Sequence, residues 1–527
     1  MTHQEVLEGR PESREDRSGV AVLPVPGRLT TAELELAARG PVRVAIADDA
    51  AGGVAAGHAF MLACVERGQD IYGVTTGFGN LVGFAGRATA HEQSEGFLDF
   101  LTAGHGPDLP PEVMRATLLA RVWSLAKGRS AVSPSALRTL TAVLETSFAP
   151  AVPRMGSVGA SGDLIPLAYA VRAMQGQGHA YVDGARMPAA EALDRCGLSP
   201  LHLAGRDAVA LVNGTSVTAA AAGLALASLA RSVNTAVTLT ALLADLLGSD
   251  PGFAAAPTLA AFGHPQGEDV AAGLRALLKG TVPTGTRPLQ EPYSIRCSPQ
   301  LIGASASALH YAATVIGDDL NGINDNPLFF AEDEVVTHGG NFFSQPVAFA
   351  ADTMSTVAAQ LANLAERQLD LLTDTHRNSG LPPMLATEPG RQHGVVGMQI
   401  SATATVAAMR RAAVPVSNQS LPTNGHNQDV VPLGTQAALT ALDQAGQLRW
   451  VQGALGVALR QAGYLSPRGV TAPACAAVLH ELSAAVTPID PDRPLDADVR
   501  RAGDLLDRLA AARAPWRGAP CAVPSGA

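Results

Sequence analysis

Aromatic and charged side chains are both scarce in this chain of 527 residues, at 4% and 16% of the sequence. The formal net charge is −10 and no basic stripe interrupts it, which argues against nucleic acid as a partner. The five cysteines are odd in number, widely scattered and form no CxxC pair. They therefore indicate reduced thiols in a cytoplasmic protein rather than a disulfide framework or a zinc site.

Several catalytic sequence patterns are also missing. The chain contains no HExxH, no GxxxxGKS or GxxxxGKT and no GxSxG, and its 13 histidines are dispersed, so we expect no metal cofactor. One uncharged stretch, Ala208 to Ala230, is long enough to cross a bilayer. It holds polar residues such as Asn213 and lies between Asp207 and Arg231, which favours a helix buried in a protein without a membrane partner.

Hydrophobic residues, by contrast, make up 47% of the chain, and many of them recur at helical spacing. Two such stretches are Met354, Val357, Leu361 and Leu364, and Val499, Ala502, Leu505 and Leu509. Alternating patterns typical of strands are few, so the sequence predicts a mainly α protein. We expect a disordered or loosely ordered lead-in over 1–40, an N-terminal region over 41–205, a helical region over 206–513 and a tail over 514–527.

The most informative segment is 156–164, which reads GSVGASGDL. If a tight turn presses the amide nitrogen of Gly162 onto the carbonyl carbon of Ala160, a five-membered ring can close. Loss of two waters then leaves an imidazolone with a methylidene made from the Cβ of Ser161, which is an electrophile that no ordinary side chain provides. Glycine suits the nitrogen position because it is unhindered and tolerates forced backbone angles. By composition alone, such a stretch is more often an ordinary loop.

The longer segment GSVGASGDLIPLAYA resembles the signature of the aromatic amino acid ammonia-lyases and 2,3-aminomutases. This resemblance implies the cofactor 4-methylidene-imidazole-5-one (MIO), formed autocatalytically from Ala160, Ser161 and Gly162. It also implies a long central helix bundle with a smaller MIO-bearing N-terminal region. Members of the family are homotetramers in which three subunits share each active site.

Further motifs follow in the family's order over roughly residues 70–435. Tyr72, in IYGVTTGFG, matches the base that removes the β-proton of the substrate, although alone it is an ordinary half-buried aromatic residue. In QEPYSIRCSPQ, Arg296 matches the clamp on the substrate carboxylate, Tyr293 a second active-site tyrosine and Gln290 a polar contact. Outside this context, an arginine such as Arg296 is most often a surface residue or the partner of a carboxylate.

Four more positions are implied by the same resemblance. Asn213 in LVNGTS and Asn326 in INDNPLF match residues near the MIO and the carboxylate, and their ordinary interpretation is helix capping or a turn. Phe342 in HGGNFF matches an aromatic lining position, with a core phenylalanine as the alternative. Gln428 in NGHNQDVV matches a glutamine that contacts the MIO region.

Two positions bear on the substrate and the product. Members acting on histidine have Ser-His where this chain has Phe100-Leu101, and those preferring tyrosine have a histidine there; an apolar pair is typical of phenylalanine-acting members. Asn424 stands where many phenylalanine lyases have glutamate, whereas tyrosine lyases and the 2,3-aminomutases have asparagine. We therefore predict a phenylalanine 2,3-aminomutase that works through a cinnamate intermediate, an activity that supplies β-amino acids for natural products. The alternatives are an ammonia-lyase acting on phenylalanine or, third, tyrosine, and, remotely, a non-catalytic helical scaffold.

Overall fold

The computed structural model describes residues 14–15, 20–87, 89–513 and 516–519, which divide into two compact units. The first unit combines residues 1–224 with 314–352 and 415–439, and the second combines 225–313, 353–414 and 440–527. The two units thus interleave along the chain, whereas the sequence predicted a division near residue 205. The reason is that four long helices each cross from one unit into the other: α9 (Ser216–Leu247), α13 (Ser298–Leu320), α14 (Gln345–Thr373) and α16 (Gly434–Leu465).

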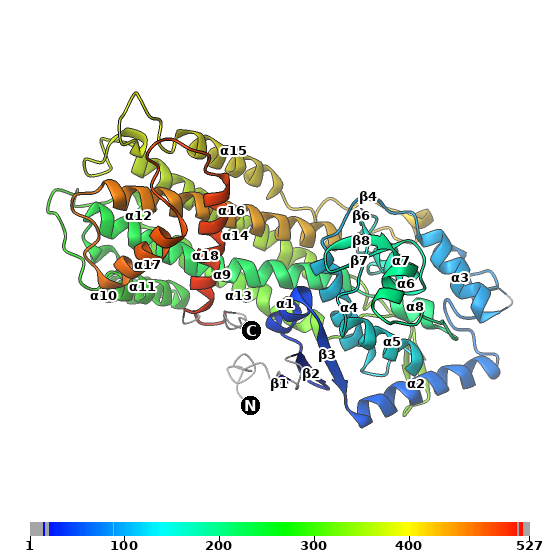
Figure 1. Ribbon diagram of the computed structural model, residues 1–527. Helices are drawn as coiled ribbons and strands as arrows, with labels where there is room; N and C mark the ends of the chain where they lie inside the picture. The colour runs from blue at the N-terminus through cyan, green and yellow to red at the C-terminus, as the bar shows by residue number, and fades with distance from the viewer. Residues whose placement is uncertain (1–13, 16–19, 88, 514–515, 520–527) are drawn as a thin grey trace. The chain divides into compact units, whose positions relative to one another are not determined.

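The first unit contains most of the short elements (Figure 1). Its helices are α1 (Thr31–Arg39), α2 (Asp48–Glu66), α3 (Ala90–Leu101), α4 (Pro111–Leu125), α5 (Pro134–Leu144), α6 (Leu164–Met174), α7 (Ala189–Arg195) and α8 (Asp207–Val212), with 3-10 turns η1 (Gly79–Leu81) and η4 (Asn424–His426). Its strands are β1 (Arg14–Glu15), β2 (Ala21–Val25), β3 (Val42–Ile46), β4 (His105–Asp108), β5 (Ala149–Pro150), β6 (Pro153–Met155), β7 (His179–Val182), β8 (Ala185–Pro188), β9 (Leu328–Phe330) and β10 (Val335–Thr337).

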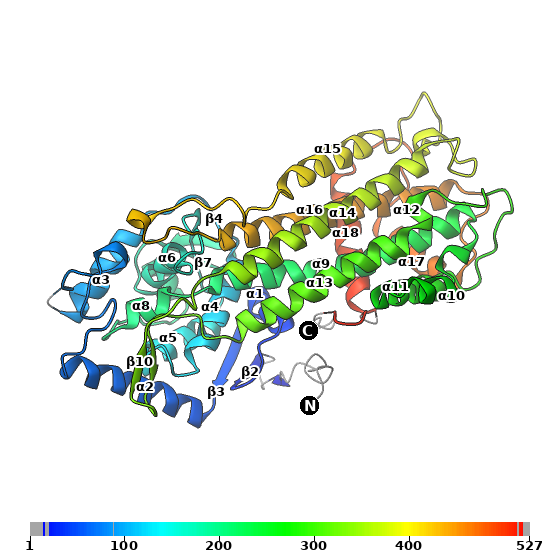
Figure 2. The same ribbon diagram turned by 180° about the vertical axis from the view of Figure 1, so that it is seen from behind.

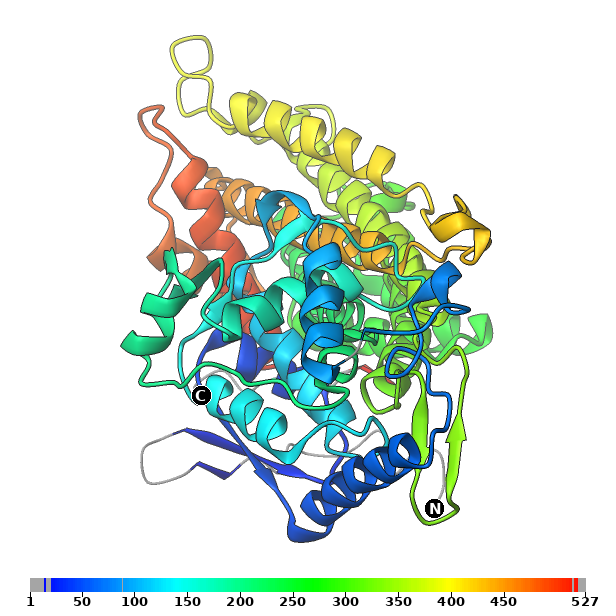
Figure 3. The ribbon, with the colours of Figure 1, turned by 90° about the vertical axis from the view of Figure 1, so that its right-hand side faces the viewer.

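These strands form small sheets around the helices of the first unit. β2 pairs with β1 antiparallel and with β3 parallel, β5, β7 and β8 form a second sheet, and β4–β6 and β9–β10 are two-stranded. The β9–β10 ribbon lies beside α2, as Figure 3 shows. Helix α4, which starts at Pro111 and is buried from Val113 to Leu125, forms the core of the unit.

In the second unit, all the regular elements among the described residues are helices. Besides its parts of the four long helices, of which α13 and α14 are seen unbroken in Figure 2, it holds η2 (Pro251–Ala254), α10 (Ala256–Phe262), α11 (Pro265–Leu277), α12 (Tyr293–Arg296), η3 (Pro383–Leu385), α15 (Val396–Ala412), α17 (Pro473–Ala485) and α18 (Asp496–Ala511). The mainly α fold is therefore confirmed. The two periodic stretches lie in α14 and α18, where Met354 and Val499 are buried.

Both ends of the chain differ from the sequence-based expectation where they are described. Within the predicted lead-in, β2 and α1 are regular elements, because Thr30 and Glu33 form a capping box that starts α1 and because β3 pairs with β2. Residues 1–13 and 16–19 lie outside the described part. In the predicted tail, Trp516 is buried and Arg517 bonds to Asp269, while 514–515 and 520–527 are not described.

The apolar stretch expected as one buried helix is divided at Asn213–Thr215, between α8 and α9. Helix α9 is long and apolar enough to span a membrane, and its most apolar window is almost entirely buried. Burial of this kind is typical of a core helix, as the polar residues of the stretch predicted.

Candidate active site

One cavity of about 1180 Å³ lies in the first unit, and most of the predicted site residues line it. The predicted residues on its wall are Tyr72, Phe100, Leu101, Ser161, Gly162, Asn213, Asn326, Phe342, Asn424 and Gln428. They come from seven separate stretches of the chain between residues 72 and 428. The fold therefore brings together in one unit what the sequence presents only as scattered motifs.

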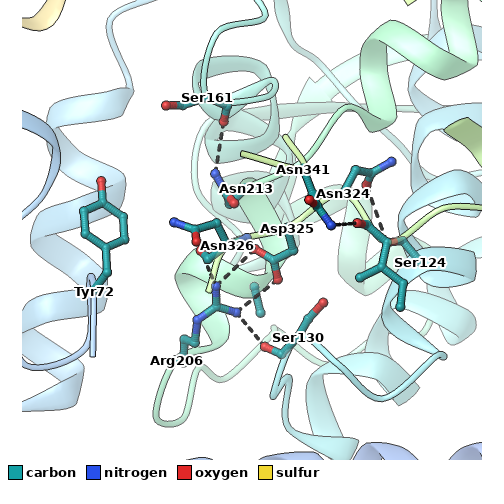
Figure 4. Close-up of polar contacts among 12 residues, drawn as sticks. Tyr72, Ser124, Ser130, Ser161, Arg206, Asn213, Asn324, Asp325, Asn326 and Asn341 are labelled. Atoms are coloured by element: carbon teal, nitrogen blue, oxygen red, sulfur yellow. Dashed lines mark hydrogen bonds and ion pairs between the residues drawn. The ribbon is translucent and has the colours of Figure 1, made fainter. Parts of the chain in front are cut away.

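The Ala160-Ser161-Gly162 turn precedes α6 and is held from both sides. Asn213 donates from Nδ2 to the carbonyl oxygen of Ser161 at 3.1 Å, and Gln428 donates from Nε2 to its Oγ at 3.0 Å. Ala160 is buried and packs against Val431 and Leu433. The carbonyl and the hydroxyl of Ser161 are thus both fixed while the residue still faces the cavity (Figure 4).

Gly162 occupies a position that only glycine can fill. Its φ is +67°, and an added Cβ would lie 2.3 Å from the carbonyl oxygen of Gly214, with which it forms an isolated bridge. The next residue, Asp163, is fully buried and donates its amide to the same carbonyl at 2.7 Å. An unhindered nitrogen at position 162, held in a tight turn, is what ring closure requires.

The carboxylate of Asp163 anchors this turn to the rest of the unit. It accepts hydrogen bonds from Ser157 Oγ at 3.0 Å, from Thr218 N and Oγ1 at 2.8 and 2.9 Å, and from Thr435 Oγ1 at 2.6 Å. Burial raises the pKa of Asp163, and these four hydrogen bonds oppose the rise. The residues present therefore fit a turn built to form MIO. Among the described residues, no cluster of His, Cys, Asp or Glu is suited to hold a metal ion.

Tyr72 follows α2 at the start of a loop that forms one wall of the cavity. Its Oη accepts a hydrogen bond from the amide of Gly79 at 2.9 Å, and its own amide donates to Nε2 of His338 at 3.4 Å. Burial raises the pKa of Tyr72 above its usual value of 10.0, while the Gly79 amide acts in the opposite direction. Tyr72 and Ser161 approach the same space from different segments, as Figure 4 shows.

The loop that carries Tyr72 is folded back on itself and fastened to α3. Thr76 and Ala85 form an antiparallel bridge across it. The buried side chain of Gln93 then joins both arms, because its Nε2 donates to the carbonyl of Thr76 at 3.1 Å and its Oε1 accepts from the amide of Arg87 at 2.8 Å. Gln93 thereby fixes the position of the loop relative to α3.

Aromatic side chains extend from this loop to the predicted ring pocket. Phe78 stacks on Phe97 at 4.2 Å between ring centroids and lies 6.0 Å from Phe100 and 6.1 Å from Tyr72. Phe100 and Leu101 end α3, and both line the cavity, Leu101 buried and Phe100 with 57% of its surface exposed. This wall is apolar, as their residue types predicted.

The remaining predicted residues of the first unit adopt defined positions on the cavity wall. Asn424 lies in η4 with φ of +53°, and its amide is so close to Gly79 that a Cβ added there would lie 2.2 Å from Nδ2. Asn326 accepts from the amide of Gly339 at 2.8 Å, and Phe342 is half-buried. Asn213 is also the C-cap residue of α8, and its Oδ1 is buried without a partner among the described residues.

Gln290, Tyr293 and Arg296 belong to the second unit and do not line the cavity of the first. Tyr293 is 71% exposed, and the Arg296 guanidinium lies 4.8 Å from the centre of its ring. The short helix α12 that carries both is held by the buried Gln368, which donates to the carbonyl of Ser294 at 2.8 Å. Gln290 is exposed.

Sequence reasoning missed several residues that shape the site. Phe78 lies inside the motif IYGVTTGFG, and Phe97 precedes Phe100 by three residues, which places both on one face of a helix, so their positions offered a signal. Asp163 directly follows the Ala-Ser-Gly triplet, so its role could also have been predicted from its position in the sequence. Gln93 has no comparable signal, because its partners Thr76 and Arg87 meet it only through the fold.

A carboxyl group behind the site gives a prediction for the pH dependence of stability. Burial raises the pKa of Asp319 to about 6, the Thr215 hydroxyl lowers it and nearby Asp163 raises it again. The folded protein therefore binds a proton more tightly than the unfolded chain, so this group makes the free energy of unfolding fall as pH rises from about 4 to 6. The effect is on the order of 2–3 kcal/mol.

We expect Asp319→Asn to remove that dependence. In urea titrations, the free energy of unfolding of Asp319→Asn minus that of the natural protein should be larger at pH 7 than at pH 4.5. Asp318→Asn, which alters an exposed neighbour, serves as the control. The prediction would be contradicted if the free energies of unfolding of Asp319→Asn and of the natural protein differed by the same amount at both pH values.

Comparison with known proteins agrees with this geometry. The family model described as "Aromatic amino acid lyase" matches residues 29–484, a range that contains every predicted site residue. The chain belongs to this family. Its members include a tyrosine ammonia-lyase of Cereibacter sphaeroides, which is 39% identical over 492 residues, covering 88% of this chain and 93% of that protein. Other relatives are histidine ammonia-lyases at 35 or 36% identity.

Solved structures of related enzymes share the fold of this chain. The tyrosine aminomutase of Streptomyces globisporus superposes with a TM-score of 0.85 at 31% identity, covering 91% of this chain and 95% of that one. The phenylalanine aminomutase of Pantoea agglomerans gives a TM-score of 0.84 at 27% identity, covering 92% and 98%. The chain is therefore an aromatic amino acid lyase or aminomutase.

Proposed function

We propose that this protein is an MIO-dependent 2,3-aminomutase that converts L-phenylalanine to β-phenylalanine through cinnamate. The observation that carries the proposal is the cavity in which Tyr72, the Ser161 turn and the Phe100-Leu101 pair face the same space. A base, a turn able to form an electrophile and an apolar pocket for a ring are the parts that ammonia elimination from an aromatic amino acid needs.

The MIO, once formed from Ala160, Ser161 and Gly162, supplies an electrophilic carbon that makes the substrate amine a better leaving group. Tyr72 takes the proton from the β-carbon through Oη, the electrons of that C–H bond form the Cα–Cβ double bond, and the Cα–N bond breaks. For the mutase outcome, nitrogen returns to the β-carbon and a proton to the α-carbon, so that substrate and product have the same formula. Asn213 and Gln428 hold the turn in place through Ser161.

The apolar pair at the end of α3 favours phenylalanine over tyrosine. Phe100 and Leu101 offer no polar atom to a phenol hydroxyl in their part of the cavity. A buried hydroxyl without a partner costs about 1–3 kcal/mol, which corresponds to a preference of roughly 5- to 150-fold for the unsubstituted ring.

The choice between mutase and lyase rests on Asn424. A neutral amide at this position is compatible with holding the amine for return, whereas an acidic group can help to draw it away. Asn424 also packs against Gly79, whose amide contacts the Tyr72 hydroxyl, so it touches the loop that carries the proposed base. The second candidate is an ammonia-lyase that releases cinnamate, and the 39% identity to a tyrosine ammonia-lyase favours it.

We further propose a cytoplasmic homotetramer in which Tyr293 and Arg296 of a partner subunit complete the cavity. This follows from the resemblance, in which subunits share each site, and from the placement of α12 in the second unit with Tyr293 exposed. Arg296 would bind the substrate carboxylate with its planar fork. The free thiols of Cys64, Cys196, Cys297 and Cys475 support a reducing compartment.

Two measurements test the proposal. Intact mass spectrometry should show a chain lighter by two waters, and chromatography after incubation with L-phenylalanine should show β-phenylalanine as the main product. Cinnamate and ammonia alone would replace the mutase by the lyase, and faster turnover of parallel L-tyrosine or L-histidine samples would overturn the substrate. An unmodified mass without turnover would leave only a non-catalytic helical scaffold.

Replacing Phe100 by histidine should shift the substrate preference. A ring nitrogen at this position gives a tyrosine hydroxyl a hydrogen-bond partner, so the ratio of kcat/KM for tyrosine to that for phenylalanine should rise by about tenfold or more. Phe60→His, at a phenylalanine on α2 that does not line the cavity, is the matched control. An unchanged ratio would mean that Phe100 does not face the substrate ring.

A further inference from the structure

Two asparagines of the cavity, Asn213 and Asn326, are attached to a buried ionic cluster that the proposed chemistry does not use. Asn213 ends the six-residue helix α8, and Asn326 directly follows Asp325. Asp325 is 1% exposed, and its carboxylate faces two arginines from different parts of the first unit, Arg206 and Arg121. Figure 4 shows Arg206 and Asp325 between the two asparagines and the carbonyl of Ser130.

Arg206, which immediately precedes α8, makes a bidentate pair with Asp325. Its Nη1 and Nη2 each lie 3.1 Å from a carboxylate oxygen of Asp325. The same two nitrogens donate to the carbonyl oxygens of Ser130 at 2.6 Å and Asn326 at 2.7 Å. The Asp325 carboxylate also accepts from the amide of Asn326 at 2.7 Å. The backbone of Asn326 is therefore fixed on both its polar groups by this one ion pair.

Arg121, on the buried helix α4, holds the other end of α8. Its Nε donates to the carbonyl oxygen of Ala210 at 3.1 Å and its Nη2 to the same oxygen at 2.5 Å, three residues before Asn213. Its Nη2 lies 3.8 Å from Asp325. Its Nη1 fills the space beside Gly214, where an added Cβ would come within 2.1 Å, and this nitrogen has no partner among the described residues.

A cluster of this kind is costly to bury, and stability alone does not account for it. Two guanidinium groups and one carboxylate are removed from water with exposed fractions of 1% or less, and two guanidinium nitrogens, Arg121 Nη1 and Arg206 Nε, have no partner among the described residues. Apolar side chains of similar volume often replace such buried ion pairs without loss of stability. What the cluster does provide is fixed geometry, because its hydrogen bonds end on the backbone next to the two cavity asparagines.

We propose that Arg121, Arg206 and Asp325 are positioning residues of the active site. Arg121 fixes Asn213 through the end of α8, so that Asn213 Nδ2 meets the carbonyl of Ser161, and Arg206 with Asp325 fixes Asn326, which also lines the cavity. None of the three lines the cavity, so each acts through an asparagine that does. This inference rests on the proposed function, because Ser161 must be the residue that forms MIO for the placement of Asn213 to matter.

A double-mutant cycle tests this role. Arg121→Lys keeps the charge but loses the paired donation to Ala210, and it is combined with Asn213→Ala. If Arg121 acts through Asn213, Arg121→Lys alone should lower kcat/KM for phenylalanine by about tenfold or more, yet change it less than about twofold when Asn213 is already alanine. Equal effects in both backgrounds would overturn the proposal. The intact mass of each variant reports separately whether the two waters are lost, and Arg121→Lys should slow that loss.

The second cycle pairs Arg206→Lys with Asn326→Ala. It tests in the same way whether Arg206 acts through Asn326, and it applies even if Arg121→Lys does not fold. The control is Arg186→Lys, at an exposed ion pair with Asp108, which should leave kcat, KM and the mass unchanged. Failure of both cluster variants to fold while the control folds would make the cluster purely structural and overturn the inference. A natural protein without the mass loss or turnover would instead overturn the proposed function.

Discussion

Ser161→Ala is expected to abolish turnover of aromatic amino acids while leaving the fold intact. The serine Cβ is the atom that becomes the electrophilic carbon, so alanine removes the group itself, and kcat/KM should fall by at least about four orders of magnitude. The turn should persist, because the carbonyl of residue 161 still accepts from Asn213 and Asp163 keeps its four hydrogen bonds. Among the described residues, the one side-chain hydrogen bond lost is that from Gln428 Nε2 to Ser161 Oγ.

Three measurements check this result together. The intact mass of Ser161→Ala should match the unmodified chain, its thermal midpoint should stay within a few degrees of the natural protein, and the near-UV absorbance of the dehydrated ring should be missing. Ser401→Ala, at an exposed serine of α15, is the matched control and should retain the mass loss and the activity. Activity retained in Ser161→Ala would contradict the whole assignment.

Tyr72→Phe should stop the proton transfer but leave ring formation unaffected. A positioned general base contributes about 10²–10⁴-fold to the rate, so kcat/KM should fall within that range while the chain still loses two waters. Burial raises the pKa of Tyr72, so the phenolate fraction, and with it the rate of the natural enzyme, should increase with rising pH on the alkaline side. The residual rate of Tyr72→Phe should lack this increase.

Tyr169→Phe provides the comparison for Tyr72→Phe. Its hydroxyl also bonds to a backbone group, the carbonyl of Gly104 at 3.2 Å, but Tyr169 does not line the cavity. Kinetics of both variants between pH 7 and 10 should therefore separate loss of a base from loss of a structural hydroxyl. If Tyr169→Phe loses as much activity as Tyr72→Phe, Tyr72 is not the base.

The two largest effects concern residues that local sequence motifs already indicated, and this is not a coincidence. Ring closure involves atoms of three consecutive residues, so its chemistry is written in the order Ala160-Ser161-Gly162. The loop motif of Tyr72 and the helix end at Phe100-Leu101 are likewise local. Each of these side chains lies on the cavity wall, with the exception of Ala160, which packs behind it against Val431.

The groups that hold these residues in place have no local signature. Gln93 reaches the loop of Tyr72 across 17 residues, and Arg206 meets Asp325 across 119. Neither a periodic pattern nor a motif predicts such a meeting. The contact of Gln93 depends on how the Tyr72 loop folds back onto α3, and that of Arg206 depends on how the chain returns to the first unit after leaving it. The same return, over 314–352 and 415–439, brings Asn326, Phe342, Asn424 and Gln428 to the cavity.

The sequence by itself determined the family, the mainly helical fold and the triplet whose backbone can close a ring, since covalent order and helical periodicity are properties of neighbouring residues. Only the tertiary structure decided which side chains face Ser161, how the Tyr72 loop is fastened and that a buried pair of arginines around Asp325 supports two cavity asparagines. It also assigned Tyr293 and Arg296 to the second unit, whereas the residues that line the cavity belong to the first. These outcomes depend on contacts between distant segments, and burial of the apolar helices, rather than any local preference, fixes those contacts.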